Sequence, residues 1–359
     1  MRKPVIHQVL LGAAEGDAIT QMAFALRAEL QKFAVSEIYA LWRHGDVMNE
    51  STLALADIPK SDETDLLLYH SSIGWQEMTD FLLSRTEKIA ISYHNITPAH
   101  FYEKFQPEFA KDLKLGRTEL ELIRDKVVLT IADSNFNAVD IKQHGYRDVK
   151  VVPAGFSPKR LCEEIYDIYL LNELAMEFPN GYVIAVGQVL PHKRIEQVIE
   201  AMHIMNSTYW GNIGLVICGV ARQAEYREAI NKFQKRCAMV KVQYPGAVTN
   251  RQLATYIRGA RAYLGMSDHE GLCIPPVEAM SLGVAVIIKG AGAVPETMAD
   301  GALVLPENCG PILAAEAIHE VLTNSEVRWN LINAGYRRSE ELDSRSSSFQ
   351  TAEILRAAV

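Results

Sequence analysis

The sequence predicts an α/β protein built from two tandem, doubly wound Rossmann-like domains with a cleft between them. The chain has 359 residues, which is more than one ordinary hydrophobic core accommodates. Short β-rich runs alternate with helical patterns from end to end, as in parallel sheets with crossover helices. The runs form two series joined near residues 154–178. Open α/β sheets bind ligands beyond the carboxyl ends of their strands, so we expect functional residues in those loops.

The first domain is expected over residues 1–160. A helix should follow its first strand, because Asp17 stands at an N-cap position and five apolar side chains recur on one helical face. These side chains are Ile19, Met22, Leu26, Leu30 and Phe33. The strands are expected at residues 5–11, 37–43, 65–70, 88–94, 127–132 and 149–153.

The second domain is expected over residues 175–340. Thr249 and Gln252 have the spacing of a capping box, and Gly259 should end the helix that they start. Residues 310–324 and 325–358 have wholly helical patterns. The strands are expected at residues 182–188, 213–219, 239–246, 261–266, 284–288 and 302–306.

Composition argues against several classes of protein. A net charge of -8 is unsuited to binding nucleic acid, because phosphate backbones are held by clustered Lys and Arg. The five cysteines are odd in number, scattered and never spaced as CxxC, which predicts reduced thiols and not a disulfide framework or zinc site. No apolar run approaches the roughly 20 residues of a membrane span. We therefore expect a cytoplasmic protein.

The segment SDHEGLCIPPVEAMSLGVAVII, residues 267–288, places two carboxylates around a predicted helix start. Its Pro-Pro pair suits a first helical turn, so Glu278 should lie in that turn, near the positive end of the helix dipole. The helix amides could hold a diphosphate, while Glu270 and Glu278 accept hydrogen bonds from hydroxyl groups, as a sugar nucleotide requires. Alternatively, Glu278 only complements the dipole and Glu270 is a solvated loop residue. A glycosidase pair is a further reading, but the sequence does not indicate that either glutamate is buried.

The stretch EGLCIPPVEAMSLGVAVI resembles the E-x7-E segment of retaining glycosyltransferases of the GT-B fold, family 4. The resemblance implies that Glu270 contacts the donor sugar and Glu278 the ribose of the nucleotide. Residues 186–202 resemble the family's other donor segment, which implies that Lys193 holds the diphosphate; its alternative is a solvated residue at a helix start. Gln188 replaces the usual arginine, for which either Arg194 or the neutral amide could substitute.

Other donor contacts follow from the same resemblance. The family's loop equivalent to residues 245–248 lies against the nucleobase, and Cys273 stands where glycine is common. The loop at 12–19 would approach the donor, unless it is a plain strand-to-helix turn. Ser267 could equally cap its own loop. The donor-binding residues implied in addition to Gln188, Lys193, Arg194 and Glu278 are Gly12, Ala13, Gly16, Gly246, Val248, Ser267, Gly271, Leu272 and Cys273.

The segment YHNITPAHFY, residues 93–102, resembles the HN-x-TP histidine segment of bacterial polysaccharide glycosyltransferases. This implies that His94 lies beside the reacting carbon and is catalytic, together with Glu270. Asn95 and Thr97 would orient His94 or end the strand before the following proline. His70, also at the end of a strand, could line the acceptor side. An isolated histidine after a strand can also be purely structural.

The predicted reaction is retaining transfer of a hexosyl group, of mannosyl or glucosyl/galactosyl type. The donor would be a UDP- or GDP-linked sugar, and the acceptor a hydroxyl of a saccharide or lipid-linked saccharide. Neither cofactor nor metal is expected, because the acidic cluster at 62–65 precedes its strand instead of following it. By the resemblance, the helix near 344–359 packs back on the first domain. The resemblance also implies that residues 100–126 could touch the acceptor or the inner face of the cytoplasmic membrane. The acidic residues of this segment match its basic ones, so we expect at most weak peripheral membrane contact.

Two other functions remain open. A sugar-nucleotide epimerase of the same architecture would isomerise its donor without an acceptor. A catalytically inactive sugar-nucleotide-binding protein would bind the donor without turnover, and Gln188 and Cys273 favour this reading. A dinucleotide-dependent oxidoreductase is disfavoured, because neither half carries GxGxxG followed by an acidic residue about 20 positions later.

Overall fold

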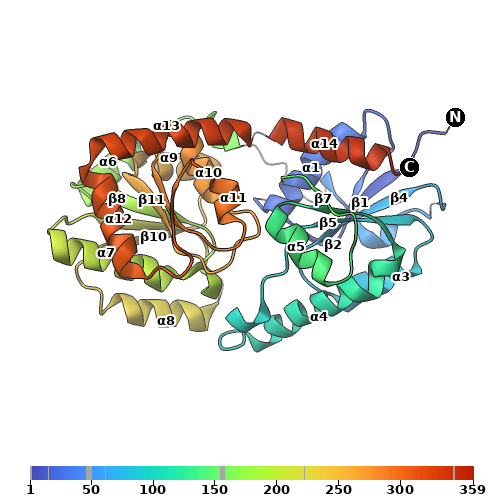
Figure 1. The fold of residues 1–359 in the computed structure, drawn as a ribbon, viewed down its shortest axis with the longest axis horizontal. Helices are drawn as coiled ribbons and strands as arrows, with labels where there is room; N and C mark the ends of the chain where they lie inside the picture. Colours follow the sequence, from blue (N-terminus) through green and yellow to red (C-terminus); the bar gives the residue numbers. More distant parts are fainter. Residues whose placement is uncertain are drawn as a thin grey trace. The chain divides into compact units, whose positions relative to one another are not determined.

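The computed structural model describes residues 2–14, 16–45, 51–60, 62–153, 158–221, 223–342 and 344–359. The chain divides into two compact units. Unit 1 comprises Met1–Ser157 with Asp343–Val359, and unit 2 comprises Pro158–Leu342. Each is a parallel sheet with helices packed around it (Figure 1). The predicted fold class, two Rossmann-like α/β domains, is thereby confirmed.

The sheet of unit 1 has seven strands in the order β3-β2-β1-β4-β5-β6-β7, all parallel. Six of them match the predicted strands, and the short β3 was not predicted because two residues carry no recognisable period. The strands are β1 (Ile6–Ala14), β2 (Ile38–His44), β3 (Leu53–Ala54), β4 (Leu66–Ser71), β5 (Lys88–Tyr93), β6 (Val127–Ala132) and β7 (Lys150–Val151).

Strand β1 extends beyond its predicted end, so Gly12 and Ala13 lie in the sheet and not in a glycine loop. Gly12 is opposite Trp42 and Ala13 opposite Arg43, because β2 is long enough to continue the ladder. Ala13 is fully buried in the core between β1 and β2. The expected loop is thus reduced to the residues after Ala14, where Gly16 has a φ of +76°.

The helices of unit 1 follow the predicted pattern. Helix α1 begins after Asp17, whose carboxylate accepts a hydrogen bond from the Thr20 amide at 2.9 Å. Met22, Leu26 and Leu30 are buried as predicted, whereas Phe33 lies beyond the end of the helix. The helices are α1 (Ala18–Leu30), α3 (Gln76–Ser84), α4 (Pro107–Ile123), α5 (Asn135–Gln143) and α14 (Ser344–Arg356), with short 3-10 turns at Leu55–Asp57, Ala99–Phe101 and Arg124–Lys126.

Helix α14 belongs to unit 1 although it is last in the sequence. The helical stretch predicted over 325–358 is two helices, α13 (Ser325–Glu341) and α14, because α13 ends with Leu342 as its C-cap. Helix α14 lies against α1 (Figure 1). It buries Ala352 and Leu355 in a cluster with Ile6, Leu26 and Leu30.

The sheet of unit 2 has six parallel strands in the order β10-β9-β8-β11-β12-β13, all of them predicted. The capping box of Thr249 and Gln252 is present. The strands are β8 (Tyr182–Val186), β9 (Gly214–Cys218), β10 (Val242–Gly246), β11 (Ala262–Gly265), β12 (Val286–Lys289) and β13 (Leu303–Leu305). The helices are η4 (Pro158–Leu161), α6 (Ile168–Glu177), η5 (Pro191–Lys193), α7 (Ile195–Tyr209), α8 (Ala224–Gln234), α9 (Asn250–Gly259), α10 (Ile274–Ser281), α11 (Val294–Met298), α12 (Pro311–Thr323) and α13.

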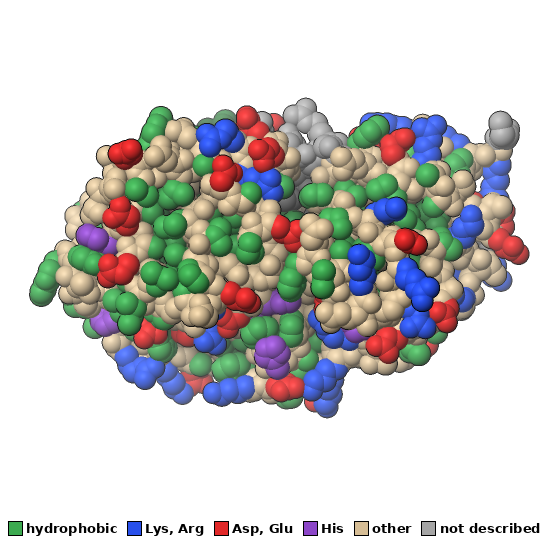
Figure 2. Space-filling model, in the orientation of Figure 1, with side chains coloured by type: hydrophobic (Ala, Val, Ile, Leu, Met, Phe, Trp, Pro, Cys, Tyr) green, Lys and Arg blue, Asp and Glu red, His purple; other side chains and the backbone are tan. Residues whose placement is uncertain are grey.

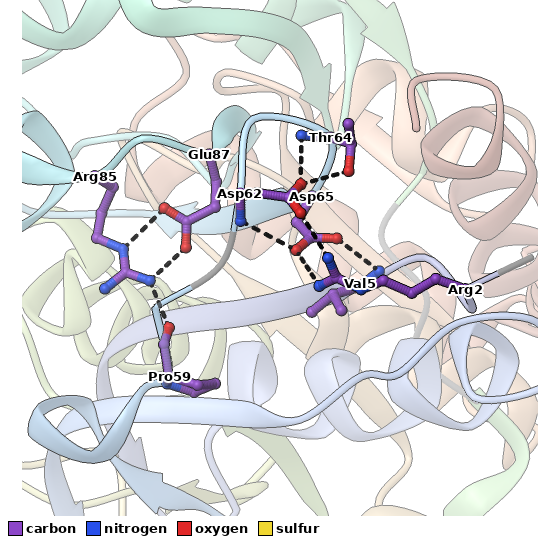
Figure 3. Close-up of polar contacts among 8 residues, drawn as sticks. All are labelled: Arg2, Val5, Pro59, Asp62, Thr64, Asp65, Arg85 and Glu87. Atoms are coloured by element: carbon purple, nitrogen blue, oxygen red, sulfur yellow. Dashed lines mark hydrogen bonds and ion pairs between the residues drawn. The ribbon is translucent and has the colours of Figure 1, made fainter.

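The acidic cluster at 62–65 lies in a network of ion pairs and hydrogen bonds with Arg2 and Val5, near the amino ends of β1 and β4 (Figure 3). Arg2 donates hydrogen bonds to Asp62 at 2.6 Å and to Asp65 at 2.7 Å, and the Val5 amide also donates to Asp65. Within the described residues, no three His, Cys, Asp or Glu side chains are grouped as metal ligands would be. Arg2 thus binds both aspartates of this cluster.

On the face shown in Figure 2, acidic and basic side chains are interspersed over both units. Among the helices of the described residues, none combines the length and the apolar content needed to cross a membrane.

Candidate functional site

The loop between β11 and α10 holds Glu270 in a buried ion pair. The side-chain ammonium of Lys193 donates to its Oε1 at 2.7 Å. Burial alone would raise the pKa of Glu270, but the neighbouring Lys193 charge and the hydrogen bonds from Lys193 and Ser267 lower it below the ordinary value. Glu270 is 8% exposed. It is therefore an ionised, buried carboxylate and not a solvated loop residue.

Lys193 ends the short turn η5, which follows β8. The Asp268 amide donates to the carbonyl of His192 at 2.8 Å, so this turn is tied directly to the loop that carries Glu270. Burial lowers the pKa of Lys193, but the Glu270 carboxylate outweighs this effect and raises it. Burial also lowers the pKa of His192 to about 3, so this ring is neutral at physiological pH. Lys193 is consequently the charged partner of Glu270, which excludes the solvated alternative.

Five of the predicted donor residues line one small cavity of about 20 Å³ at the carboxyl ends of β8 and β11. They are Gln188, Lys193, Ser267, Glu270 and Cys273.

Arg194 lies beside this group, but its Nε contacts Glu196 at 3.2 Å and Asp268 at 3.3 Å. In this arrangement, Lys193 is the cation that faces Glu270, and Arg194 neutralises acidic neighbours.

Glu278 is not in the first turn of α10, contrary to the prediction. The helix begins at Ile274, one residue before the two prolines, so Glu278 is its fifth residue and lies in the second turn. It is only 2% exposed, and Arg160 donates from Nε to its Oε1 at 2.7 Å. Burial raises the pKa of Glu278, and Arg160 opposes that rise. Its partner is therefore an arginine 118 residues away, not the helix dipole.

Both glutamates are thus buried, which the sequence did not indicate. Sequence reasoning also missed Arg160, because η4 carries no motif and no spacing relates it to α10. The guanidinium reaches Asn250 Oδ1 with its Nη1 at 2.9 Å. Arg160 thus links Glu278 to Asn250, the first residue of α9, which follows the loop that contains Gly246 and Val248. Neither of those two residues is among the lining residues of the cavity at Glu270.

Cys273 is the N-cap of α10 and has a φ of +72°, in the left-handed region that favours glycine. This conformation explains why glycine would suit the position. Gly271 and Leu272 precede it in the same loop and are half-buried. The Cys273 thiol is buried, which raises its pKa well above the ordinary value. It is therefore a neutral thiol at physiological pH and not an activated nucleophile.

In unit 1, His94 lies at the carboxyl end of β5 with both ring nitrogens engaged. Its Nδ1 is 2.7 Å from Asp133 Oδ2, and its Nε2 is 2.9 Å from His70 Nδ1. His70 and His94 are therefore together, as residues of neighbouring strand ends. Asp133, which follows β6, was not identified from the sequence. Asp133 could have been recognised as a candidate site residue, because it is a polar residue directly after the predicted strand VVLTIA.

The rest of the HN-x-TP segment is anchored to the helices around it. Asn95 has a φ of +73° and donates from Nδ2 to Asn137 Oδ1 at 3.0 Å. Arg117 on α4 donates to the Ile96 carbonyl at 2.6 Å, and Thr97 is half-buried in the loop that follows. The ring of His94 is positioned by Asp133 and His70, a role that the sequence suggested for Asn95 and Thr97.

The N-terminal donor residues are placed differently. Ala13 is buried in the core of unit 1, so its side chain cannot contact a ligand. A Cβ at Gly12 or Gly16 would meet no atom within 4 Å, so both face open space.

Known proteins resemble the chain at the level of sequence. The family model described as "Glycosyl transferases group 1" matches residues 177–338. The O-antigen chain mannosyltransferase B of Escherichia coli is 22% identical over 250 residues, which are 68% of this chain and 64% of that protein. The O-antigen chain mannosyltransferase RfbU of Salmonella typhimurium is 28% identical over 124 residues, about a third of each chain. The matched regions therefore cover less than two thirds of the length of each of these two relatives.

Solved structures resemble the chain over its whole length. WaaG, a glycosyltransferase involved in lipopolysaccharide biosynthesis, has a TM-score of 0.74 at 12% identity, covering 98% of this chain and 99% of its own. Anabaena HepE, solved with UDP and glucose, has a TM-score of 0.74 at 15% identity, covering 98% and 100%. These findings confirm the resemblance seen in the sequence. Residues 177–338 thus match the model of the group 1 glycosyl transferases, and the chain as a whole has the fold of the GT-B glycosyltransferase structures.

Proposed function

We propose that this protein transfers a hexosyl group from a nucleotide-diphosphate sugar to a hydroxyl of a saccharide or lipid-linked saccharide. Transfer would retain the anomeric configuration and need no metal. The observation that carries the proposal is the Lys193–Glu270 ion pair, a half-buried cation and a buried carboxylate 2.7 Å apart at the strand ends of the region that matches the glycosyl transferases group 1 model. A donor sugar presents both the anion and the hydroxyl groups that such a pair can bind.

The two charges would have different tasks. Lys193 would stabilise the negative charge that develops on the departing diphosphate, where a preorganised cation contributes most to the rate. Glu270 would accept hydrogen bonds from hydroxyl groups of the sugar. Glu278 would do the same for the ribose, in exchange for its bond to Arg160. No nucleophile is assigned, since the buried Cys273 thiol is unreactive and both glutamates are engaged by cations.

The relatives suggest the classes of donor and acceptor. Two are named as mannosyltransferases acting on the O-antigen chain, and WaaG acts in lipopolysaccharide biosynthesis. We therefore propose a mannosyl, glucosyl or galactosyl donor linked to GDP or UDP, and an acceptor belonging to a cell-surface polysaccharide. A lipid-linked acceptor would bring the protein into peripheral contact with the cytoplasmic membrane.

The test is a donor screen followed by turnover. GDP-mannose, UDP-glucose and UDP-galactose are compared by thermal shift, since a ligand at 100 times its Kd should stabilise the protein by about 2.7 kcal/mol. The stabilising donor is then incubated with a panel of O-antigen-type saccharides, and the anomeric configuration of the product is read by NMR. Lys193→Ala should lower kcat/KM by roughly 10²–10³-fold. The matched control, Lys241→Ala, removes an exposed lysine of the same unit and should leave it unchanged.

Other outcomes would overturn the proposal. Isomerised sugar in the absence of any acceptor would identify an epimerase. Strong donor binding without turnover across the panel would identify a sugar-nucleotide-binding protein. A product of inverted configuration would refute retention.

A further inference from the structure

A chain of four polar side chains crosses the sheet of unit 1, one from each of four neighbouring strands or strand ends. Gln8 on β1 is 2.9 Å from His70 on β4, His70 is 2.9 Å from His94 after β5, and His94 is 2.7 Å from Asp133 after β6. All four side chains are at least nine-tenths buried. Because buried polar atoms must be paired correctly, the arrangement restricts where protons can lie.

The protons can be placed by starting from Gln8. Its amide nitrogen donates to the carbonyl of Ala23 at 2.9 Å, so its oxygen faces His70 Nε2 and requires a proton there. Burial, together with the nearby His94, lowers the pKa of His70 well below its ordinary value, so this ring is neutral and has only that proton. His70 Nδ1 is therefore an acceptor, and His94 Nε2 must donate to it.

The other nitrogen of His94 needs a proton as well. Its Nδ1 lies 2.7 Å from the Asp133 carboxylate, and two lone pairs facing each other at that distance would repel. A proton between them makes a charge-assisted hydrogen bond, which is the strong kind. His94 then carries protons on both nitrogens, and its positive charge is neutralised by Asp133.

We propose that Asp133 is a positioning residue that holds His94 as an imidazolium, with one N–H group bound to Asp133 and the other to His70, so that His94 has no free nitrogen with which to act as a general base. This inference rests on the proposed function for its consequence, but its structural part concerns unit 1 alone. Sequence comparison of the segment around His94 would not reveal it, because Asp133 lies on another strand. The neutral partners are equally necessary for this protonation state. Gln8 determines which nitrogen of His70 carries the proton, and His70 in turn accepts the proton of His94 Nε2.

The surroundings leave Asp133 as the charged partner of His94. A cavity of about 30 Å³ lies beside the pair, large enough for one or two water molecules. The described polar residues that line it are His70, Ser92, His94 and Asp133 from the sheet, and Ser348 and Thr351 from α14. None of the others carries a charge, since His70 is neutral. Replacing Asp133 should therefore change the protonation of His94 directly.

The test is NMR of the full-length chain labelled with ¹⁵N-histidine, using long-range ¹H–¹⁵N correlations near neutral pH. We expect two protonated nitrogens for His94 and a single Nε2 proton for His70, with signals assigned from His94→Gln and His70→Gln. Asp133→Asn preserves shape and hydrogen bonding, because its amide can donate to an unprotonated Nδ1. It should convert His94 to the neutral form and lower kcat at least tenfold, with the KM for the donor changed less than twofold.

Asp125→Asn is the matched control, since it removes an exposed carboxylate of the same unit and should change neither signal nor kcat. A neutral His94 in the wild-type protein would overturn the inference even if transfer is rapid, and this measurement needs no variant to fold. Unchanged kcat in Asp133→Asn would overturn it too. An imidazolium in a protein without transferase activity would instead refute the proposed function and leave the assignment of Asp133 standing.

Discussion

Glu278 is a buried carboxylate that depends on one arginine. Its motif could be recognised from the sequence, since Glu270 and Glu278 stand eight positions apart around a Pro-Pro pair. The burial of Glu278 and its pairing with Arg160 could not be recognised from the sequence. Helix α10 starts earlier than the prolines suggest, and Arg160 lies in a turn that is distant in the sequence. The spacing of residues specifies which face of a helix a side chain occupies. It does not specify what packs against that face.

Replacing Arg160 should therefore destabilise the protein in a pH-dependent way. Arg160→Ala leaves the Glu278 carboxylate buried without a counter-charge. We expect this to lower the free energy of unfolding by about 1–3 kcal/mol near pH 7, which is less than for a fully buried ion pair because Arg160 is itself partly exposed. Burial already raises the pKa of Glu278, and losing Arg160 should raise it further. The folded variant then takes up a proton more readily than the unfolded chain. Its deficit relative to wild type should shrink as the pH is lowered from 7 to 5.

Urea denaturation of both proteins at the two pH values measures this effect. Adding Glu278→Gln to Arg160→Ala should restore most of the stability, since it removes the unpaired charge. A deficit of equal size at pH 5 and pH 7 would show that the lost packing of Arg160, and not the charge of Glu278, is responsible.

At the scale of elements, the site is built by loops that contact each other across strand ends. The Ala293 amide donates to the Glu270 carbonyl at 2.9 Å, so the loop after β12 holds the loop after β11 in place. The preceding residue, Gly292, has a φ of +62°. A Cβ at Gly292 would lie 2.3 Å from the Glu270 carbonyl oxygen. The position of Glu270 thus requires glycine at residue 292.

Gly292→Ala should accordingly cost at least about 2 kcal/mol and weaken donor binding, because both backbone strain and the clash displace Glu270. Thermal unfolding and donor titration of the variant measure the two effects. Gly310→Ala is the control: a Cβ there meets nothing within 4 Å and its φ is -107°, so we expect a change within about 1 kcal/mol and normal donor binding. Normal stability of Gly292→Ala would mean that the two loops are not coupled.

The sequence located most elements but not all of their ends. Strands with a clear apolar run were found, and capping by Asp17 and by Thr249 was predicted and is present. The predicted end of strand β1 was too early, because Gly12 was interpreted as the start of a turn. A ladder partner decides whether such a residue stays in the sheet, and β2 supplies one for Gly12 and Ala13.

At the scale of the whole molecule, unit 1 is completed by the last helix of the chain. Leu355 is fully buried in the cluster with Ile6 and Leu26, and Glu353 lies on the exposed face of the same helix. Unit 1 therefore depends on residues more than 180 positions beyond Ser157, the end of its first segment.

Leu355→Ala should destabilise unit 1 by about 2–5 kcal/mol, the usual cost of a cavity at a fully buried leucine. Hydrogen exchange measured by mass spectrometry should show faster exchange in α1 and α14, with α7 and α12 of unit 2 unchanged. Glu353→Ala is the control on the same helix and should alter stability by less than about 0.5 kcal/mol. Equal exchange in α1 of the two variants would contradict the role given to α14.

The fold class and the E-x7-E motif could be predicted from the sequence, because the periodicity of apolar residues and the spacing of a motif are local properties of the chain. Tertiary structure alone decided the partners: Lys193 against Glu270, Arg160 against Glu278, and Asp133 against His94. Each pair joins residues that are tens of positions apart or more. For Lys193, Glu270 and Glu278, the direction of the pKa shift follows from burial and from the neighbouring charge, and both arise only when the chain folds.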